Sequence, residues 1–188
     1  MGKILVGLFM AFDGVIEGPG PQDNFERAGW TMPYYSDEIG QIIGAQTASS
    51  DALLLGRVTY DGFKSSFEHQ TDGMSMALNN IPKVVVSTTL KSADWNNSTL
   101  ISHNVIEEIR KLKDAGKTMS VSGSCSLVHS LQQSDLIDEY GLFVYPVVVG
   151  KGKRLFTDTD VVKTMKLLEA RQLPGGVMYM RYQPETKA

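Results

Sequence analysis

Three turns of this chain combine glycine with hydroxyl or basic side chains, and each could hold an anion. Residues 56–59 read Gly-Arg-Val-Thr and residues 123–126 read Gly-Ser-Cys-Ser, each after a short apolar run. A helix that begins at such a turn directs free backbone N–H groups at a bound phosphate. Residues 150–154 read Gly-Lys-Gly-Lys-Arg and form a third candidate. Taken singly, the first could equally be an ordinary strand-to-helix turn with a surface arginine, and the second a turn with capping serines. For the third, a solvated basic loop is the favoured interpretation.

Other reactive side chains are sparse. Asp13 ends the first apolar run, where parallel sheets bind ligands, although Asp-Gly also favours a plain turn. Cys125 and His129 lie four residues apart and could pair as thiol nucleophile and base, but simple packing is the favoured interpretation. His69, His103 and His129 have no metal-ligand spacing, so no metal site is expected.

Composition indicates a globular protein with a single domain over residues 1–188. The chain is 42% hydrophobic and 21% charged, with a net charge of −3 and no basic stripe, which argues against nucleic-acid binding. One cysteine excludes an internal disulfide and fits a cytoplasmic setting. The apolar run at residues 4–12 is too short to span a bilayer, so no membrane partner is expected.

Strand and helix patterns alternate along the first two thirds of the chain. Runs rich in branched residues predict buried strands at residues 3–12, 52–55, 83–87 and 118–122. Apolar periodicity predicts helices at residues 36–49, 104–115 and 124–133. Residues 14–21 and 68–80 are expected to be loops.

The last third changes character. A long strand is expected at residues 139–149, followed by a hairpin of residues 165–171 and 177–182 around Pro-Gly-Gly. The fold class is therefore α/β, with three αβα layers and a mixed central sheet that ends in an antiparallel C-terminal hairpin.

In this order, the turns and strands resemble the dihydrofolate reductase-like superfamily. The chain is most similar to stand-alone relatives of the reductase domain of bifunctional riboflavin biosynthesis proteins, the RibD C-terminal domain. The matching segments span most of the chain: residues 10–16, 53–60, 82–90, 121–128 and 136–156. The resemblance implies a dihydrofolate reductase-like, mainly parallel sheet that binds NADPH along its strand ends, and a homodimer.

The resemblance also implies which residues hold the cofactor. Its Gly-Arg-x-Thr turn holds phosphates, its serine-ending strand meets the adenosine 2′-phosphate, and its Gly-Ser turn approaches the pyrophosphate. These roles map in turn to Gly56, Arg57 and Thr59; to Ser87 and Thr88; and to Gly123, Ser124, Ser126 and Leu127. Many riboflavin-type relatives carry arginine where Thr88 stands, so one charge that favours NADP over NAD is missing here.

The activity implied is NADPH-dependent reduction of a small heterocycle by hydride transfer, similar to 5-amino-6-(5-phosphoribosylamino)uracil reductase. Asp13 would lie near the nicotinamide or substrate. Glu38 lies near the place of the carboxylate that serves the pterin in folate reductases, although it could simply complement a helix dipole. A folate reductase proper and a non-catalytic NADP(H)-binding protein are the alternatives. One cysteine could not supply a zinc deaminase signature, so only the reductase half is expected.

Overall fold

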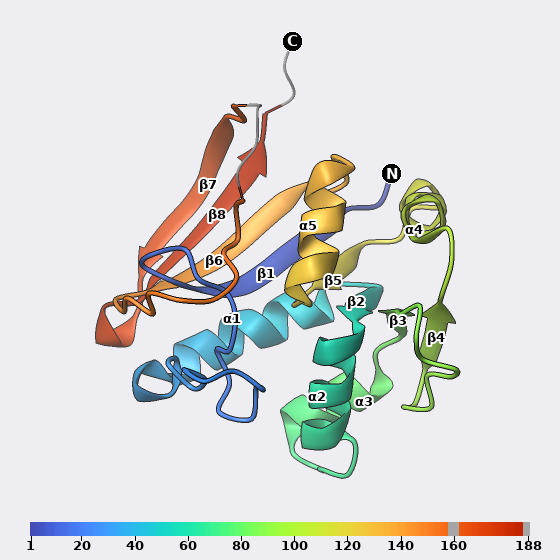
Figure 1. Cartoon of the computed structure of the whole chain (residues 1–188), viewed down its shortest axis with the longest axis horizontal. Helices are drawn as coiled ribbons and strands as arrows, with labels where there is room; N and C mark the ends of the chain where they lie inside the picture. The colour runs from blue at the N-terminus through green and yellow to red at the C-terminus, as the bar shows by residue number, and fades with distance from the viewer. Residues whose placement is uncertain (158–161, 186–188) are drawn as a thin grey trace.

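The computed structural model describes residues 1–157 and 162–185. Within these residues eight strands form one sheet in the order β4-β3-β2-β5-β1-β6-β8-β7 (Figure 1). The strands are β1 (Ile4–Ala11), β2 (Ala52–Gly56), β3 (Lys83–Val86), β4 (Ser98–Ile101), β5 (Met119–Val121), β6 (Glu139–Tyr145), β7 (Met165–Gln172) and β8 (Met178–Pro184). The α-helices are α1 (Asp37–Ala48), α2 (Arg57–Phe67), α3 (Gly73–Asn80), α4 (Val105–Asp114) and α5 (Cys125–Gln133).

The sheet is mixed. Strands β4, β3, β2, β5, β1 and β6 pair in parallel, so their carboxyl ends meet at one edge. β8 runs antiparallel to both β6 and β7. The short 3-10 turn Pro174–Gly176 joins β7 to β8. This confirms the predicted α/β class with an antiparallel C-terminal hairpin.

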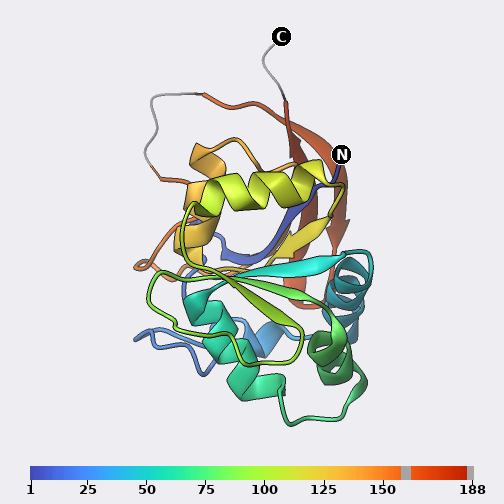
Figure 2. The same cartoon turned by 90° about the vertical axis from the view of Figure 1, so that its right-hand side faces the viewer.

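Helices cover both faces of the sheet, as Figure 2 shows. Ile4, Val6 and Leu8 of β1 pack with residues of α4 and α5 on one face. Phe9 and Ala11 of the same strand pack with α1 on the other face. A separate cluster joins α2 and α3 to β2 and β3. The alternation along β1 is the period of two that a strand imposes on its side chains, and it produces the three predicted layers.

Three expectations needed correction. Residues 68–80 are not one loop, because α3 occupies their second half. Asp72 caps α3 by accepting hydrogen bonds from the backbone N–H groups of Met74 and Ser75 at 3.1 Å each. β4 was not expected at all. The strand predicted at residues 139–149 ends at Tyr145, because Pro146 has no N–H to continue the ladder.

Candidate cofactor cleft at the strand ends

The turn after β2 and the turn after β5 touch each other. The N–H of Gly56 donates to the carbonyl of Gly123 at 3.0 Å. A Cβ on Gly56 would lie 2.2 Å from Ser124 Oγ, and one on Gly123 would lie 2.6 Å from Thr59 Oγ1. Both positions therefore require glycine for steric reasons. We call residues 56–59 and 123–126 the paired turns.

Each of the paired turns opens a helix whose first N–H groups lack a side-chain cap. Gly56 is the N-cap residue of α2 and Ser124 that of α5, and neither makes a side-chain capping bond. The Ser124 hydroxyl instead lies 3.0 Å from that of Ser126. The capping interpretation of Ser124 is thus wrong. The uncapped N–H groups of two adjacent helices can bind the pyrophosphate of a dinucleotide, and the glycines beside them carry no side chain that would block it. Leu127, in the first turn of α5, is buried in the core.

Arg57 extends from α2 to the polar segment that follows β3. Its Nη1 donates to Thr89 Oγ1 at 2.6 Å, and its Nε lies 3.4 Å from the Asp61 carboxylate. The Arg57 side chain is half exposed. A guanidinium held in this way can bind a phosphate bidentately. The sequence pointed to Arg57 but missed Thr89, although the run Ser-Thr-Thr after β3 was a signal for it.

Ser87 organises the same segment. Its hydroxyl accepts hydrogen bonds from the N–H groups of Thr89 at 3.2 Å and Leu90 at 3.0 Å, and its side chain is buried. Thr88 is exposed beside it. The structure therefore brings Arg57 and the segment of residues 87–89 together at one edge of the sheet. Their predicted contacts with cofactor phosphates stay a prediction.

The Asp13 carboxylate binds the loop that follows β6. Its carboxylate accepts from the N–H of Gly150 at 2.7 Å and of Val149 at 3.4 Å, and lies 3.7 Å from Arg154 Nη2. Burial opposes ionisation, but these N–H groups and the guanidinium outweigh it and hold the pKa of Asp13 below its usual value. The carboxylate thus has a structural task. Its predicted catalytic role stays a prediction.

Three ion pairs join the segment after β1 to the loop after β6. Arg154 faces Asp13, Lys153 lies 2.9 Å from Glu17, and Lys151 lies 3.0 Å from Glu26. We call these three pairs the ionic strap. Each basic side chain of residues 150–154 already faces a carboxylate. This favours the structural role for that loop over a second anion site.

Glu38 lies in the first turn of α1, one residue after Asp37. Ser36 caps this helix by accepting from the N–H of Ile39 at 3.4 Å. Both carboxylates are exposed. No hydrogen bond or ion pair within residues 1–157 and 162–185 engages Glu38, so its placement fits either a pterin-binding role or dipole complementation.

The remaining reactive residues have ordinary environments. Burial raises the pKa of the Cys125 thiol, and the ring of His129 donates through Nε2 to the Arg154 carbonyl at 2.8 Å. Within residues 1–157 and 162–185, no hydrogen bond joins His129 to Cys125, and the Nε2 hydrogen bond orients the ring toward the loop after β6. Trp30 is buried and donates to the Glu17 carbonyl at 3.0 Å, so it covers the core.

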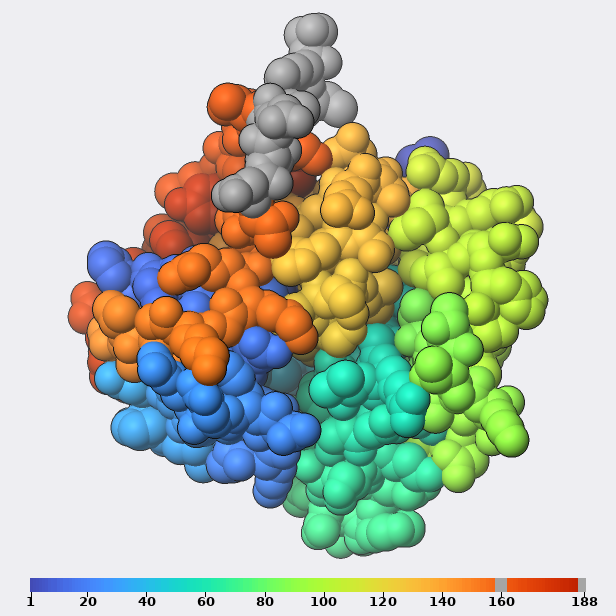
Figure 3. All heavy atoms as spheres, in the orientation of Figure 1, coloured from blue at the N-terminus to red at the C-terminus, as the bar shows by residue number. Residues whose placement is uncertain are grey.

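The surface is hollowed where these elements meet. In Figure 3 the blue N-terminal segment, the teal α2 and the yellow α5 border a depression on the viewed face.

Among residues 1–157 and 162–185, no three His, Cys, Asp or Glu side chains gather as metal ligands would. No helix in this part of the chain has the length and apolar character needed to cross a membrane.

The sheet and its helices form a dihydrofolate reductase-like fold, and the chain belongs to the RibD C-terminal domain family, which it matches over residues 3–179. It is similar to the uncharacterized protein YyaP of Bacillus subtilis, with 28% identity over 96% of this chain and 94% of that protein.

Two solved structures show the same fold. A putative riboflavin biosynthesis protein of Shewanella sp. PV-4 superposes with a TM-score of 0.78 and 17% identity, over 98% of this chain and 99% of that one. Dihydrofolate reductase of Enterococcus faecalis, complexed with NADP(H), superposes with a TM-score of 0.60 and 15% identity, over 98% of each chain.

Proposed function

We propose that this protein is an NADPH-dependent reductase that transfers hydride to a small heterocyclic substrate, similar to 5-amino-6-(5-phosphoribosylamino)uracil reductase. The observation that carries the proposal is the contact between the paired turns. Two uncapped helix N-termini open onto one cleft, and the glycines at positions 56 and 123 leave the room that a pyrophosphate needs. Membership of a reductase-domain family supports the same conclusion.

Each residue of the cleft has a defined task in this proposal. The N–H groups at the starts of α2 and α5 bind the pyrophosphate, with the hydroxyls of Ser124 and Ser126 beside them. The Thr59 hydroxyl fills the space that a side chain at position 123 would need. Arg57, Ser87 and Thr88 receive the adenosine 2′-phosphate, and Thr89 holds Arg57 in place. NADPH, when bound, supplies the hydride.

The protein's contribution to the reaction is position and exclusion of water. The segment after β1 borders the cleft, and the ionic strap fastens it to the loop after β6. Asp13 holds that connection through the N–H of Gly150. We propose that these two connected segments orient the hydride acceptor against the nicotinamide, and that Asp13 and Glu38 are the candidate groups near the substrate.

Cofactor preference depends on Arg57. Thr88 brings no charge to the 2′-phosphate, but the Arg57 guanidinium lies beside the same segment through Thr89. This supports NADPH over NADH. We also propose a cytoplasmic homodimer, which is supported by the single cysteine and by β7, a strand at the sheet edge with exposed Leu167 and Leu168.

Calorimetric titration with NADPH and with NADH tests the cofactor claim, and a substrate panel tests turnover. We expect tighter binding of NADPH and its oxidation by a ribosylaminopyrimidine. Turnover of dihydrofolate alone would identify a folate reductase. Binding without oxidation by pyrimidines, pterins or aldehydes would identify a non-catalytic binder. Absence of NADPH binding would refute the proposal.

A further inference from the structure

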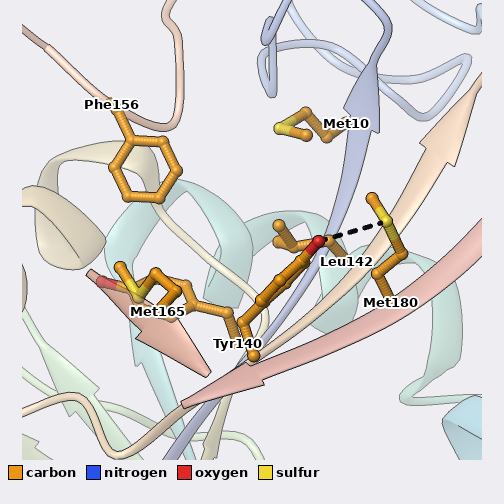
Figure 4. Close-up of a pocket in the computed structure, with 7 residues that line it drawn as sticks. Met10, Tyr140, Leu142, Phe156, Met165 and Met180 are labelled. Carbon is orange, nitrogen blue, oxygen red and sulfur yellow. Dashed lines mark hydrogen bonds between the residues drawn. The ribbon is translucent and has the colours of Figure 1, made fainter. Parts of the chain in front are cut away.

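The polar groups that can select a ligand lie at the strand ends, around Arg57. The apolar hollow lined by Met10, Tyr140, Phe156 and their neighbours (Figure 4) exposes no polar surface in the part of the chain that the structure describes. Around Arg57, by contrast, a cation, a carboxylate and two hydroxyls lie within hydrogen-bonding distance of one another. Such a cluster can discriminate between ligands that differ in charge.

The Arg57 guanidinium is shared between a neutral and a charged acceptor. Its Nη1 donates to the Thr89 hydroxyl at 2.6 Å, and its Nε donates to the Asp61 carboxylate at 3.4 Å. Asp61 lies one turn after Arg57 on α2, so the ion pair lies along the surface of that helix. No protein acceptor engages Nη2 within residues 1–157 and 162–185. Nη2 is therefore free to donate to a bound phosphate.

The Thr89 hydroxyl directs the guanidinium toward the segment after β3. Its Oγ1 lies 3.3 Å from Ser87 Oγ, so it can donate to Ser87 while it accepts from Arg57. Ser87 in turn accepts from the N–H groups of Thr89 and Leu90, which fixes the backbone of this segment. Thr89 thus holds Arg57 beside residues 87–89 without bringing a negative charge that would compete with a phosphate.

The Asp61 carboxylate acts in the opposite sense. It is half exposed, as Arg57 is, and it already neutralises part of the charge that a phosphate would seek. A second anion on the same guanidinium is repelled by this carboxylate. A ribose with a free 2′-hydroxyl carries no such charge, and in NAD sites a carboxylate accepts a hydrogen bond from that hydroxyl. The negative charge at position 61 therefore disfavours NADPH more than NADH.

We propose, on the basis of the reductase function proposed above, that Asp61 and Thr89 are positioning residues that set the cofactor preference in opposite directions. Asp61 lowers the preference for NADPH over NADH, and Thr89 raises it. Both residues act through Arg57. The balance between the two acceptors determines how strongly the site discriminates between the cofactors.

Calorimetric titration measures this preference as the dissociation constant of NADH divided by that of NADPH. Asp61→Asn should raise this ratio about threefold or more, and Thr89→Val should lower it about threefold or more. Thr89→Ser keeps the hydroxyl and should leave the ratio unchanged. Glu68→Gln is the matched control, because Glu68 forms the corresponding pair with Lys64, 3.9 Å away, at the other end of α2. It removes the same charge and should also leave the ratio unchanged.

Salt separates a charge effect from a change in the helix. In about 1 M salt the screening length falls to roughly 3 Å, so the effect of Asp61→Asn should shrink. An effect of undiminished size would come from an altered helix and would overturn the inference. Asp61 and Thr89 are exposed, so these variants should fold, and circular dichroism checks that they do.

The other opposing results are distinct. An unchanged or lowered ratio in Asp61→Asn would overturn the inference, as would an equal loss of affinity for both cofactors in Thr89→Val. If the unaltered protein binds NADPH and the ratio does not respond to these variants, this inference alone fails. If the unaltered protein binds neither cofactor, the proposed function fails with it.

Discussion

Replacing Gly56 by alanine should separate the paired turns. The new Cβ would lie 2.2 Å from Ser124 Oγ and 2.9 Å from both Ser124 Cβ and the Ser124 backbone nitrogen. A hydroxyl can rotate away, but the backbone nitrogen cannot yield without moving the start of α5. Overpacking of this kind costs about 1–3 kcal/mol. For a domain of this size that corresponds to a fall in melting temperature of roughly 2–12 °C.

The same displacement should weaken NADPH binding, because it moves the N–H groups that face the pyrophosphate. A loss of about 1.4 kcal/mol or more in binding free energy raises the dissociation constant at least tenfold. Differential scanning calorimetry and isothermal titration measure the two effects. Gly62→Ala is the matched control, because a Cβ there meets nothing within 4 Å. It should stabilise α2 by about 0.5–1 kcal/mol and leave NADPH affinity unchanged.

A double variant sharpens the argument. Ser124→Gly removes Oγ and Cβ, two of the three atoms that a methyl group at position 56 would meet, and should restore part of the lost stability. If Gly56→Ala melts and binds NADPH like the unaltered protein, the contact between the turns does not shape the cofactor site and the reasoning is refuted.

Three further predictions concern charge and the thiol. The pKa of Asp13 is lowered in the folded state, so its carboxylate stabilises the fold above that pKa and loses this contribution as the pH falls through it. Asp13→Asn should therefore lower the free energy of unfolding, measured with urea at neutral pH, by about 1–2 kcal/mol. An equal loss in strong acid would contradict this. Lys83 is buried, donates to the carbonyls of Ile81 and Asn96 at 2.8 Å each, and has its pKa lowered by burial from 10.5 to about 8. The unfolded chain keeps the Lys83 proton to higher pH than the folded protein does, so stability relative to Lys83→Met should rise by roughly 3 kcal/mol from pH 8 to 10.5. A flat difference would show that the carbonyl acceptors offset burial and that the pKa of Lys83 is not lowered. Cys125→Ala should leave NADPH affinity within about twofold. In the unaltered protein the Cys125 thiol should react with dithiobis(nitrobenzoate) more slowly than free cysteine, because burial raises its pKa. A faster reaction would support a nucleophilic role for Cys125.

The sequence predicts the central strands of the sheet well because their signals are local. The run at residues 52–55 is fully buried in β2, and the glycine after it marks where the strand gives way to α2. Parallel strands place their carboxyl ends together, so two glycine turns in separate βα units could be expected to meet. The resemblance added the order of the turns, and the structure shows the contact between Gly56 and Gly123.

The missed features depend on partners that lie far away in the chain. α3 is eight residues long with two asparagines at its end, and only the burial of Leu78 against β2 and β3 reveals its apolar side. β4 is a half-exposed edge strand that exists by pairing with β3. The basic loop looked free in sequence, since its carboxylate partners Asp13, Glu17 and Glu26 are more than a hundred residues away.

Hydrogen–deuterium exchange with and without NADPH tests the central claim most directly. If the paired turns form the cofactor cradle, NADPH should slow exchange of the backbone amides of residues 56–59 and 123–127 together, and of residues 87–89 beside Arg57. Protection confined to other segments, or no protection at saturating NADPH, would contradict the account.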